Sequence, residues 1–194
     1  MGLRERKKVQ TRRRIVDAAL NRFVEQGYEA TTVEEIAGDA DISVTTFFRY
    51  FRAKDEVLFA DSDHWAPEVR SLIEQRPADE SDLEAIHQAL RTFHEQGGVD
   101  DDARRMQRHR VTDETPVLSG RAQLVAARWK QEVAAALAER RGVDMDDRDV
   151  HLLAAISFTI LRFAEDEWYA GRGSVDWLTS LDAAFDRYAR LARA

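Results

Sequence analysis

The chain contains no cysteine, which excludes disulfide frameworks, cysteine-ligated zinc and thiol nucleophiles. It has only three prolines and nine glycines in 194 residues, so few positions interrupt a helix. Apolar residues make up 44% of the chain, and four tryptophans and nine phenylalanines supply large side chains for a core. These values favour a folded, mostly helical protein, either one compact domain or a small module joined to a larger one.

Signals for export, membrane insertion and catalysis are also missing. The basic residues 1–14 are not followed by an apolar signal core, so no secretory peptide is expected. The most apolar stretch, 152–161, is too short to span a bilayer, and we predict a cytoplasmic protein without membrane attachment. There is no glycine-rich phosphate loop, nucleophile elbow or convincing acid pair. We therefore expect no enzyme, no cofactor and no metal site.

Positive charge is confined to the N-terminal quarter. The net charge is −7, yet residues 1–54 contain 11 Lys and Arg against 8 Asp and Glu, whereas the remainder contains 18 against 28. Only this quarter can favour phosphates. The basic residues at its start are Arg4, Arg6, Lys7, Lys8, Arg12, Arg13 and Arg14. This run predicts either a nucleic-acid-binding arm that leads into a helix or a solvated, disordered tail.

Hydrophobic periodicity predicts a helix from about residue 9 to residue 26. Ile15, Ala19 and Phe23 recur every four residues, as expected for one buried face of a helix. Gly27 is a typical helix end.

Two shorter helices are predicted next, separated by a tight turn. Thr32-Val33-Glu34-Glu35 has the spacing of a capping box, which starts a helix that extends to about residue 40. Ser43 is a suitable N-cap for another helix, which directs Phe47 and Phe51 inward. Two short helices across a tight turn are typical of a helix-turn-helix.

The rest of the chain is also predicted to be helical, without a strand pattern. Further helices are expected at about 54–75 with a kink at Pro67, 79–94, 101–111, 115–142, 146–169 and 175–192. We therefore predict an all-α fold with two domains. Residues 1–54 form a three-helix helix-turn-helix domain, and residues 55–194 form a second helical domain.

The helix expected at 146–169 is apolar on nearly every side between Leu152 and Ala164. Such a helix cannot be a surface element of a monomer. We expect one face inside the subunit and the other, together with the final helix, against a second copy in a homodimer. The predicted interface residues are Leu153, Ile156, Ile160, Trp177, Leu181 and Phe185.

The stretch "TTVEEIAGDADISVTTFFRYFRAKDEVLF", Thr31 to Phe59, resembles the DNA-binding signature of the TetR family. That signature is a threonine-capped helix, an Ile-Ala pair, a turn, a threonine followed by aromatic residues, and a lysine that opens the next helix. The resemblance is specific over about residues 10–60 and is one of architecture beyond them. It implies a homodimer that binds double-stranded DNA at a palindromic operator, commonly as a repressor. It also implies that the first domain, residues 1–54, binds DNA and that the second, residues 55–194, binds a ligand and dimerises.

The resemblance assigns DNA-binding roles to particular positions. Val44, Thr45 and Thr46 would face base edges in the major groove, with Phe48 on the same side. The positions expected to touch phosphates, with added charge from Arg49, are Thr32, Ser43, Tyr50 and Lys54.

This sequence departs from the family pattern at two places. Asp41 stands in the turn where the family usually has glycine, and Asp tolerates a left-handed conformation at a cost of about 1 kcal/mol. Phe48 lacks the hydroxyl of the tyrosine often found at its position, so a phosphate contact is in doubt while stacking or contact with a thymine methyl group stays open.

The family resemblance also implies an effector pocket among the middle helices. Residues 104–110 hold four arginines and a histidine, which favours either an anion site at the mouth of a pocket or a solvated helix face. The segment "RHRVTDETPVLSGRAQL", 108–124, resembles a subgroup of actinobacterial regulators that includes the mycofactocin-system regulator, and this implies acyl-thioester ligands. The predicted ligand-binding residues are Phe93, Arg105, Arg108, His109, Leu124, Trp129, Phe158, Phe163 and Trp168.

We therefore predict a repressor that a small hydrophobic or amphiphilic effector, such as an acyl-CoA, releases from its operator. Cationic drugs attracted by Glu165, Asp166 or Glu167 are the rival effectors. A ligand-independent DNA-packaging protein would share the N-terminal domain, and a small helical enzyme is the contrasting class of function.

Overall fold

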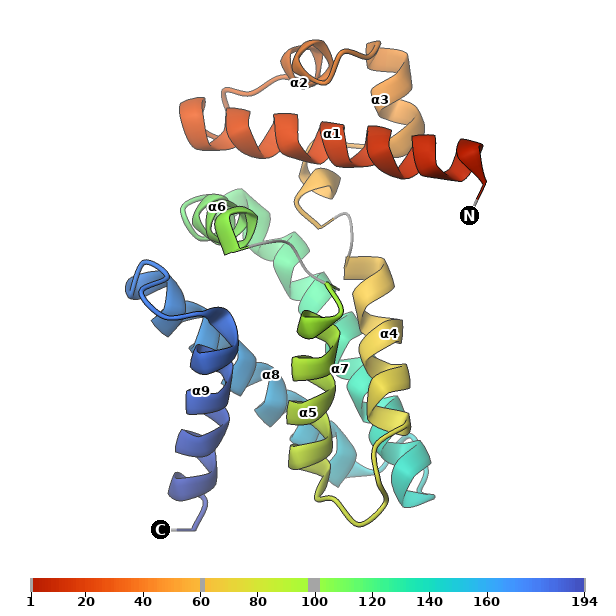
Figure 1. The fold of residues 1–194 in the computed structure, drawn as a ribbon, viewed down its shortest axis with the longest axis vertical. Coiled ribbons are helices and arrows are strands. Elements are labelled where there is room, and N and C mark those ends of the chain that lie inside the picture. The colour runs from red at the N-terminus through yellow and green to blue at the C-terminus, as the bar shows by residue number, and fades with distance from the viewer. Residues whose placement is uncertain (1, 60–61, 98–101, 194) are drawn as a thin grey trace. The chain divides into compact units, whose positions relative to one another are not determined.

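The computed structural model describes residues 2–59, 62–97 and 102–193, and within these ranges the regular structure is entirely helical (Figure 1). The predicted all-α fold is confirmed. The chain divides into two compact units. The first comprises Met1–Ala60 and Gln107–Ala122, and the second comprises Asp61–Met106 and Gln123–Ala194.

The first unit is built on a long N-terminal helix, α1, against which the next two helices pack (Figure 1). Its elements are α1 (Leu3–Gln26), α2 (Val33–Asp39), α3 (Val44–Tyr50), the 3-10 turns η1 (Asp55–Val57) and η2 (Pro116–Leu118), and parts of α6 (Asp102–Asp113) and α7 (Ser119–Arg141). Gly27 ends α1 with φ of 87°, a value that favours glycine. α1 begins at Leu3, so the basic run at the start of the chain forms the first turns of this helix.

The boundary of the first unit differs from the one expected after Lys54. Val57 and Leu58 are buried in the same core as the residues of α1, α2 and α3. Val111 of α6 and Leu118 of η2 are buried in this core too. The first unit therefore includes a segment that lies far along the chain.

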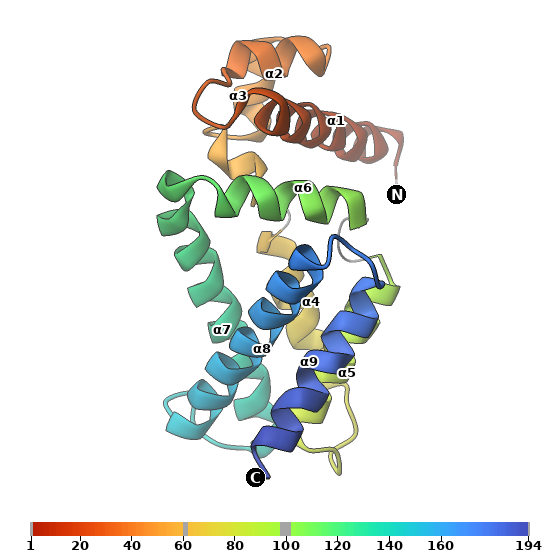
Figure 2. The same cartoon turned by 90° about the vertical axis from the view of Figure 1, so that its left-hand side faces the viewer.

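The second unit is a bundle in which α4 lies beside α5, and α8 beside α9 (Figure 2). Its elements are α4 (Ser62–Glu74), α5 (Asp82–Glu95), α8 (Arg148–Ala170) and α9 (Trp177–Leu191), with the remaining parts of α6 and α7. Ser81, Asp147 and Asp176 accept hydrogen bonds from backbone N–H groups at the starts of α5, α8 and α9. The region predicted as one helix over 54–75 holds η1 and then α4, which contains Pro67.

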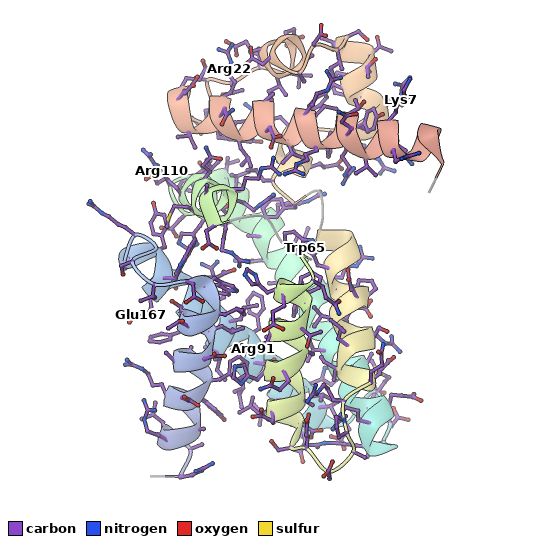
Figure 3. All side chains as sticks on the ribbon, in the orientation of Figure 1. Lys7, Arg22, Trp65, Arg91, Arg110 and Glu167 are labelled. Carbon is purple, nitrogen blue, oxygen red and sulfur yellow. The ribbon has the colours of Figure 1, made fainter. Side chains whose placement is uncertain are left out.

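A cluster of charged side chains fastens α5 to α9 in this unit. Arg91 of α5, labelled in Figure 3, forms an ion pair with Asp182 of α9. The other carboxylate oxygen of Asp182 lies 2.8 Å from His87 Nε2, and the His87 ring stacks on Phe185 with centroids 4.3 Å apart.

Within the described ranges, no helix combines the length and apolarity needed to cross a membrane.

Candidate DNA-binding surface and effector site

The turn between α2 and α3 is closed by backbone hydrogen bonds. Asp41 adopts φ of 52°, the left-handed conformation expected where the family usually has glycine. Its N–H donates to the Gly38 carbonyl over 3.1 Å, and the Ile42 N–H donates to the Ala37 carbonyl over 3.0 Å. An aspartate is therefore accommodated in this tight turn.

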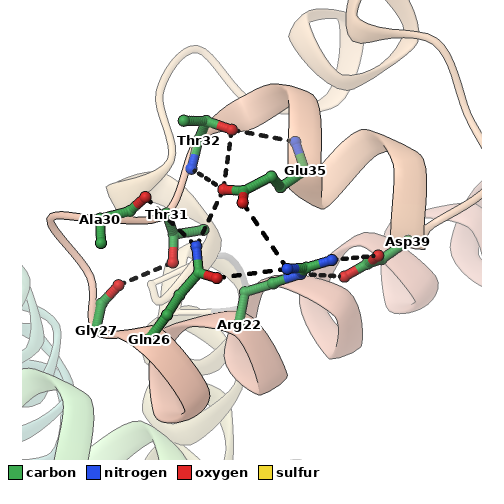
Figure 4. A network of polar contacts seen from close by, with 8 residues as sticks. All are labelled: Arg22, Gln26, Gly27, Ala30, Thr31, Thr32, Glu35 and Asp39. Carbon is green, nitrogen blue, oxygen red and sulfur yellow. Dashed lines mark hydrogen bonds and ion pairs between the residues drawn. The ribbon is translucent and has the colours of Figure 1, made fainter.

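A polar network holds α2 on α1 (Figure 4). The Arg22 guanidinium donates to both carboxylate oxygens of Asp39, with Nη2 2.9 Å from Oδ1. These hydrogen bonds lower the pKa of Asp39, so the pair stays charged. Gln26 of α1 donates to Glu35 of α2 over 3.0 Å. This network was not predicted from the sequence, although the i, i+4 spacing of Arg22 and Gln26 beside a capping box is a usable signal.

Thr32 and Glu35 form the predicted capping box, which is confirmed. Glu35 N–H donates to the Thr32 hydroxyl over 3.2 Å, while the Thr32 N–H and hydroxyl lie 2.9 and 3.0 Å from Glu35 Oε2. The bond from the Thr32 backbone is the main cause of the lowered Glu35 pKa. Because both Thr32 donors are directed to Glu35, a phosphate contact by Thr32 would have to compete with the cap.

The hydroxyl groups of Ser43 and Thr46 form a hydrogen bond with each other at the start of α3. Ser43 Oγ accepts from the Thr46 N–H over 3.1 Å and lies 2.9 Å from Thr46 Oγ1. Each hydroxyl carries one proton, and one of the two is used between them. The pair therefore offers one free O–H donor to an outside acceptor.

The outer side of α3 carries most of the residues predicted to read DNA. Thr45, Phe48 and Arg49 are exposed, whereas Val44 and Tyr50 are half-buried. The Arg49 guanidinium lies 5.6 Å from the centre of the Tyr50 ring. Phe47, on the opposite side of α3, is fully buried. The helix is thus anchored by one face and open on the other.

Lys54 lies against the loop between α1 and α2. Its Nζ donates to the carbonyls of Tyr28, Thr31 and Glu29 at 2.6, 2.8 and 3.3 Å. It also lies 4.3 Å from the centre of the Tyr28 ring, and burial lowers its pKa. An ammonium group has three N–H donors, and these three carbonyls accept all of them. This geometry gives Lys54 a part in fixing the loop, whereas the sequence predicted a phosphate contact.

Replacing Lys54 with methionine would remove the donor from three carbonyls while keeping a long side chain. We expect the free energy of unfolding to fall by about 1–3 kcal/mol. The slope of log affinity for DNA against log salt concentration should not change, because no phosphate contact is lost. Denaturant titration and DNA binding at several salt concentrations measure the two quantities.

Lys7→Met is the matched control for stability, since Lys7 is exposed on α1 (Figure 3) and its loss should leave the free energy of unfolding unaltered. A Lys54→Met protein with unchanged stability and a slope reduced by about 0.9 would show that Lys54 contacts a phosphate instead.

A small hollow in the second unit lies among α5, α7 and α8. About 210 Å³ of space, open solvent included, lies between its walls, and none of this space admits a water molecule. The lining consists of Ile86, Leu90, Trp129, Lys130, Val133, Ala154, Ser157, Phe158 and Leu161. Trp129 and Phe158 are two of the predicted ligand-binding residues. Lys130, which the sequence analysis missed, brings the one charged side chain of this lining, with Nζ 5.8 Å from the centre of the Phe158 ring. The signal that could have identified Lys130 is its position directly after Trp129, a residue already predicted to line the pocket.

Other predicted ligand-binding residues lie away from this lining. Phe93 is buried beside Trp65, and Trp168 is buried beside Trp177. Leu124 is 68% exposed on α7, and Phe163 is 39% exposed on α8. A single sequence cannot distinguish an aromatic residue that fills the core from one that lines a pocket.

The basic segment of α6 makes separate contacts in the two units. In the second unit, Arg105 lies 4.3 Å from the centre of the Trp177 ring and donates to His94 Nδ1 over 3.1 Å. Burial, and then the charge of Arg105, lower the pKa of His94, consistent with a neutral ring that accepts this bond. In the first unit, Arg108 donates to the Leu58 carbonyl, and His109 is half-buried. These arginines therefore do not line the hollow.

Two of the three acidic residues considered for a cationic effector, Glu165 and Asp166, share a partner on α8. Arg162 donates to Glu165 over 2.9 Å and to Asp166 over 3.3 Å, one helical turn away on α8. Arg162 offsets part of the negative charge of these two residues, and Glu167 is exposed on the same helix.

Most residues predicted for a dimer interface lie inside the subunit. Ile160, Trp177, Leu181 and Phe185 belong to the core of the second unit, and Leu153 and Ile156 are half-buried against it. The outward side of α8 instead presents Leu152, Thr159 and Phe163, with Leu152 58% exposed. The all-round apolar pattern of α8 did not reveal which face the subunit itself covers.

A capped helix-turn-helix with an exposed second helix, joined to a second all-helical unit, defines a DNA-binding transcription regulator. Comparison with known families agrees: residues 15–60 match the bacterial regulatory proteins of the tetR family, and residues 80–192 match the MftR C-terminal domain. The chain belongs to the TetR family of transcriptional regulators, and is accordingly a regulator of transcription and not an enzyme.

Individual relatives match over nearly the whole chain. TcmR of Streptomyces glaucescens, an HTH-type transcriptional regulator, is 34% identical over 192 residues, which cover 95% of this chain and 84% of TcmR. MftR of Mycobacterium tuberculosis is 28% identical over 184 residues, covering 93% and 90%. Among solved structures, FadR from Bacillus subtilis in complex with stearoyl-CoA has a TM-score of 0.61 at 16% identity, with 89% of this chain and 95% of FadR covered.

Proposed function

We propose that this regulator is a homodimeric repressor that binds a palindromic operator and leaves it when a hydrophobic or amphiphilic effector binds. The observation that carries the proposal is the open face of α3, where Thr45, Phe48 and Arg49 are exposed while Phe47 anchors the helix in the core. Such a face is what a recognition helix needs to enter the major groove.

The first turns of α1 add a phosphate-attracting surface in the same unit. Arg6, Lys7, Lys8, Arg13 and Arg14 are exposed on this helix. Cations that replace condensed counterions on DNA make binding fall steeply with salt. Tyr50, Ser43 and Arg49 are the proposed phosphate contacts from α3, and Val44, Thr45, Thr46 and Phe48 are proposed to face the bases.

The dimer that a palindrome requires is proposed to form through the outward sides of α8 and α9. Leu152, Thr159 and Phe163 share one side of α8, and Arg187 of α9 lies 5.4 Å from the Phe163 ring centre. Two helices from each of two subunits would make a self-complementary four-helix interface. Each subunit then brings one α3 to one half-site.

The proposed effector site is the hollow among α5, α7 and α8. Its lining is apolar except for Lys130 and Ser157, and the Ser157 hydroxyl already donates to the Ala154 carbonyl over 3.0 Å. An apolar body with an anionic group near Lys130 suits this chemistry. The acyl-CoA bound by the similarly folded FadR makes an acyl thioester the first candidate.

Ordinary ligand pockets hold roughly 300–1,000 Å³, whereas this hollow has no interior space for even a water molecule, so an acyl chain must widen it. An effector that binds the widened state better than the closed one shifts the protein towards that state. This is how effector binding would reach the DNA-binding unit, because α6 and α7 each contribute residues to both units.

Titration of the operator complex with lauroyl-CoA tests the proposal. We expect a loss of operator affinity of about tenfold, which corresponds to about 1.4 kcal/mol of coupling. Coenzyme A alone and a neutral amphiphile of the same chain length are the controls and should leave the complex intact. Equal release by the neutral amphiphile would exclude an anionic effector, and no release by any amphiphile would favour a ligand-independent DNA-binding protein.

A further inference from the structure

The exposed face of α3 is poor in hydrogen-bonding side chains. The helix reads VTTFFRY, without Asn, Gln, Asp, Glu or Lys. Asn and Gln are the side chains that pair with adenine in the major groove, and Asp and Glu accept from cytosine. Arg49 is the one charged residue of this helix, and its guanidinium lies near the Tyr50 ring.

The hydroxyl groups at this face add two O–H donors, one from Thr45 and one from the Ser43–Thr46 pair. One proton of the Ser43–Thr46 pair is used between the two side chains. Ser43 Oγ also accepts from the Thr46 N–H. Thr45 is therefore the one threonine of α3 whose hydroxyl has no part in this cap.

Apolar atoms dominate the same face instead. Phe48 is 52% exposed, and it is the one strongly exposed aromatic residue in the described part of the first unit. Val44 and Thr45 precede it by four and three residues, so their methyl groups lie on the same side of the helix. The three side chains form a small apolar surface on the outer side of α3.

The Phe48 ring packs against a buried aromatic ring of the same helix. It meets the fully buried Phe47 ring edge to face, with centroids 5.5 Å apart and planes at 87°. Phe47 in turn contacts Phe51, with centroids 5.7 Å apart. The exposed ring thus rests on the hydrophobic core of the unit and loses little freedom when it binds.

We propose that Val44, Thr45 and Phe48 form a surface that reads the 5-methyl group of thymine. This methyl group is the apolar feature that distinguishes bases in the major groove of unmodified DNA, and side-chain methyl groups and phenylalanine rings are its known partners. The inference rests on the proposed binding of DNA through α3. Part of the specificity for base sequence would then come from hydrophobic contact, because few side chains on this face can form hydrogen bonds with bases.

Exchange of thymine for uracil in the operator tests this reading, because uracil lacks the methyl group and keeps every hydrogen-bonding atom. The probe is a duplex enriched by the wild-type protein from a random library, with its thymines replaced one at a time. At one or more positions in each half-site, uracil should lower affinity about fourfold, the value for one buried methyl group. Replacement in both half-sites should lower it about fifteenfold.

The Phe48→Ala protein should bind thymine and uracil duplexes alike at the position that Phe48 contacts. Because the buried half of the Phe48 ring packs on Phe47, this substitution should lower the melting temperature by a few degrees and leave the protein folded. Val9→Ala is the matched control: Val9 is 51% exposed on α1, and its loss should leave the uracil effect intact.

Equal affinity of the wild-type protein for thymine and uracil at every position would overturn the proposal. The proposal would also fail if uracil lowered the affinity of the Phe48→Ala protein as much as that of the wild type, or if the selected half-sites contained no thymine. In each of these cases the selected duplex is still bound specifically, so the proposed operator binding stands. If the library yields no preferred duplex, operator binding and thymine reading both fail.

Discussion

Glutamate in place of Phe163 is expected to convert the dimer into monomers and to lower operator affinity at least about a hundredfold. Phe163 is 39% exposed on the outward side of α8 and is proposed to lie in the contact between subunits. A two-fold interface places both copies of a substitution in one contact, so two carboxylates would lose water there, a cost that the neighbouring Arg187 offsets only in part. Sedimentation reports the oligomeric state, and fluorescence anisotropy reports the affinity for DNA.

Leu124→Glu is the matched control for this experiment. Leu124 is 68% exposed on α7, outside the proposed interface, and its substitution should leave a dimer. Leu181→Glu is unsuitable, because Leu181 is buried in the core and a charge there would unfold the subunit. A Phe163→Glu protein that sediments as a folded dimer at micromolar concentration would place the interface elsewhere.

Reversing the charge of Lys130 is expected to weaken binding of an anionic amphiphile at least about tenfold, since hydrogen bonds to charged groups contribute roughly 1.5–3 kcal/mol. Lys130 is half-buried in the lining of the hollow, where solvent screens its charge less than at the surface. Operator affinity without effector should stay within about twofold, because Lys130 lies in the second unit. Calorimetric titration with lauroyl-CoA gives the effector affinity.

Arg128→Glu separates a specific contact from net charge. Arg128 is exposed two residues earlier on α7, and the substitution changes the charge of the protein equally. We expect this variant to bind lauroyl-CoA like the wild type. Equal weakening by both variants would show a general electrostatic effect, and an unchanged Lys130→Glu protein would exclude the proposed position of the anionic group.

The helix-turn-helix could be predicted because its signals are local in sequence. Thr32 and Glu35 are three residues apart, and so are Ser43 and the Thr46 N–H that it caps. Phe47, one of the two phenylalanines directed inward, is fully buried as expected. The start of α1 was placed six residues late, since apolar periodicity does not register a helix formed by exposed arginines and lysines, which are good helix formers.

Properties that depend on distant residues were beyond the sequence. The carbonyls that accept hydrogen bonds from Lys54 belong to residues 28–31, more than twenty positions away, and no local sequence pattern indicates them. Trp177 and Leu181 show the same apolar pattern whether they fill the core or meet a partner. The effector hollow draws its lining from three helices, so only their packing identifies Lys130.

Selection of DNA duplexes from a random library by the wild-type protein tests the central claim most directly. A dimer that reads DNA through α3 should enrich an inverted repeat whose half-site centres are about 34–36 Å apart, or a multiple of that distance, along one face of the duplex. Sedimentation of the complex should show one dimer, or an integral number of dimers, on each duplex. Equal binding of all sequences at the same salt concentration, or one chain bound to a single unrepeated site, would contradict the account.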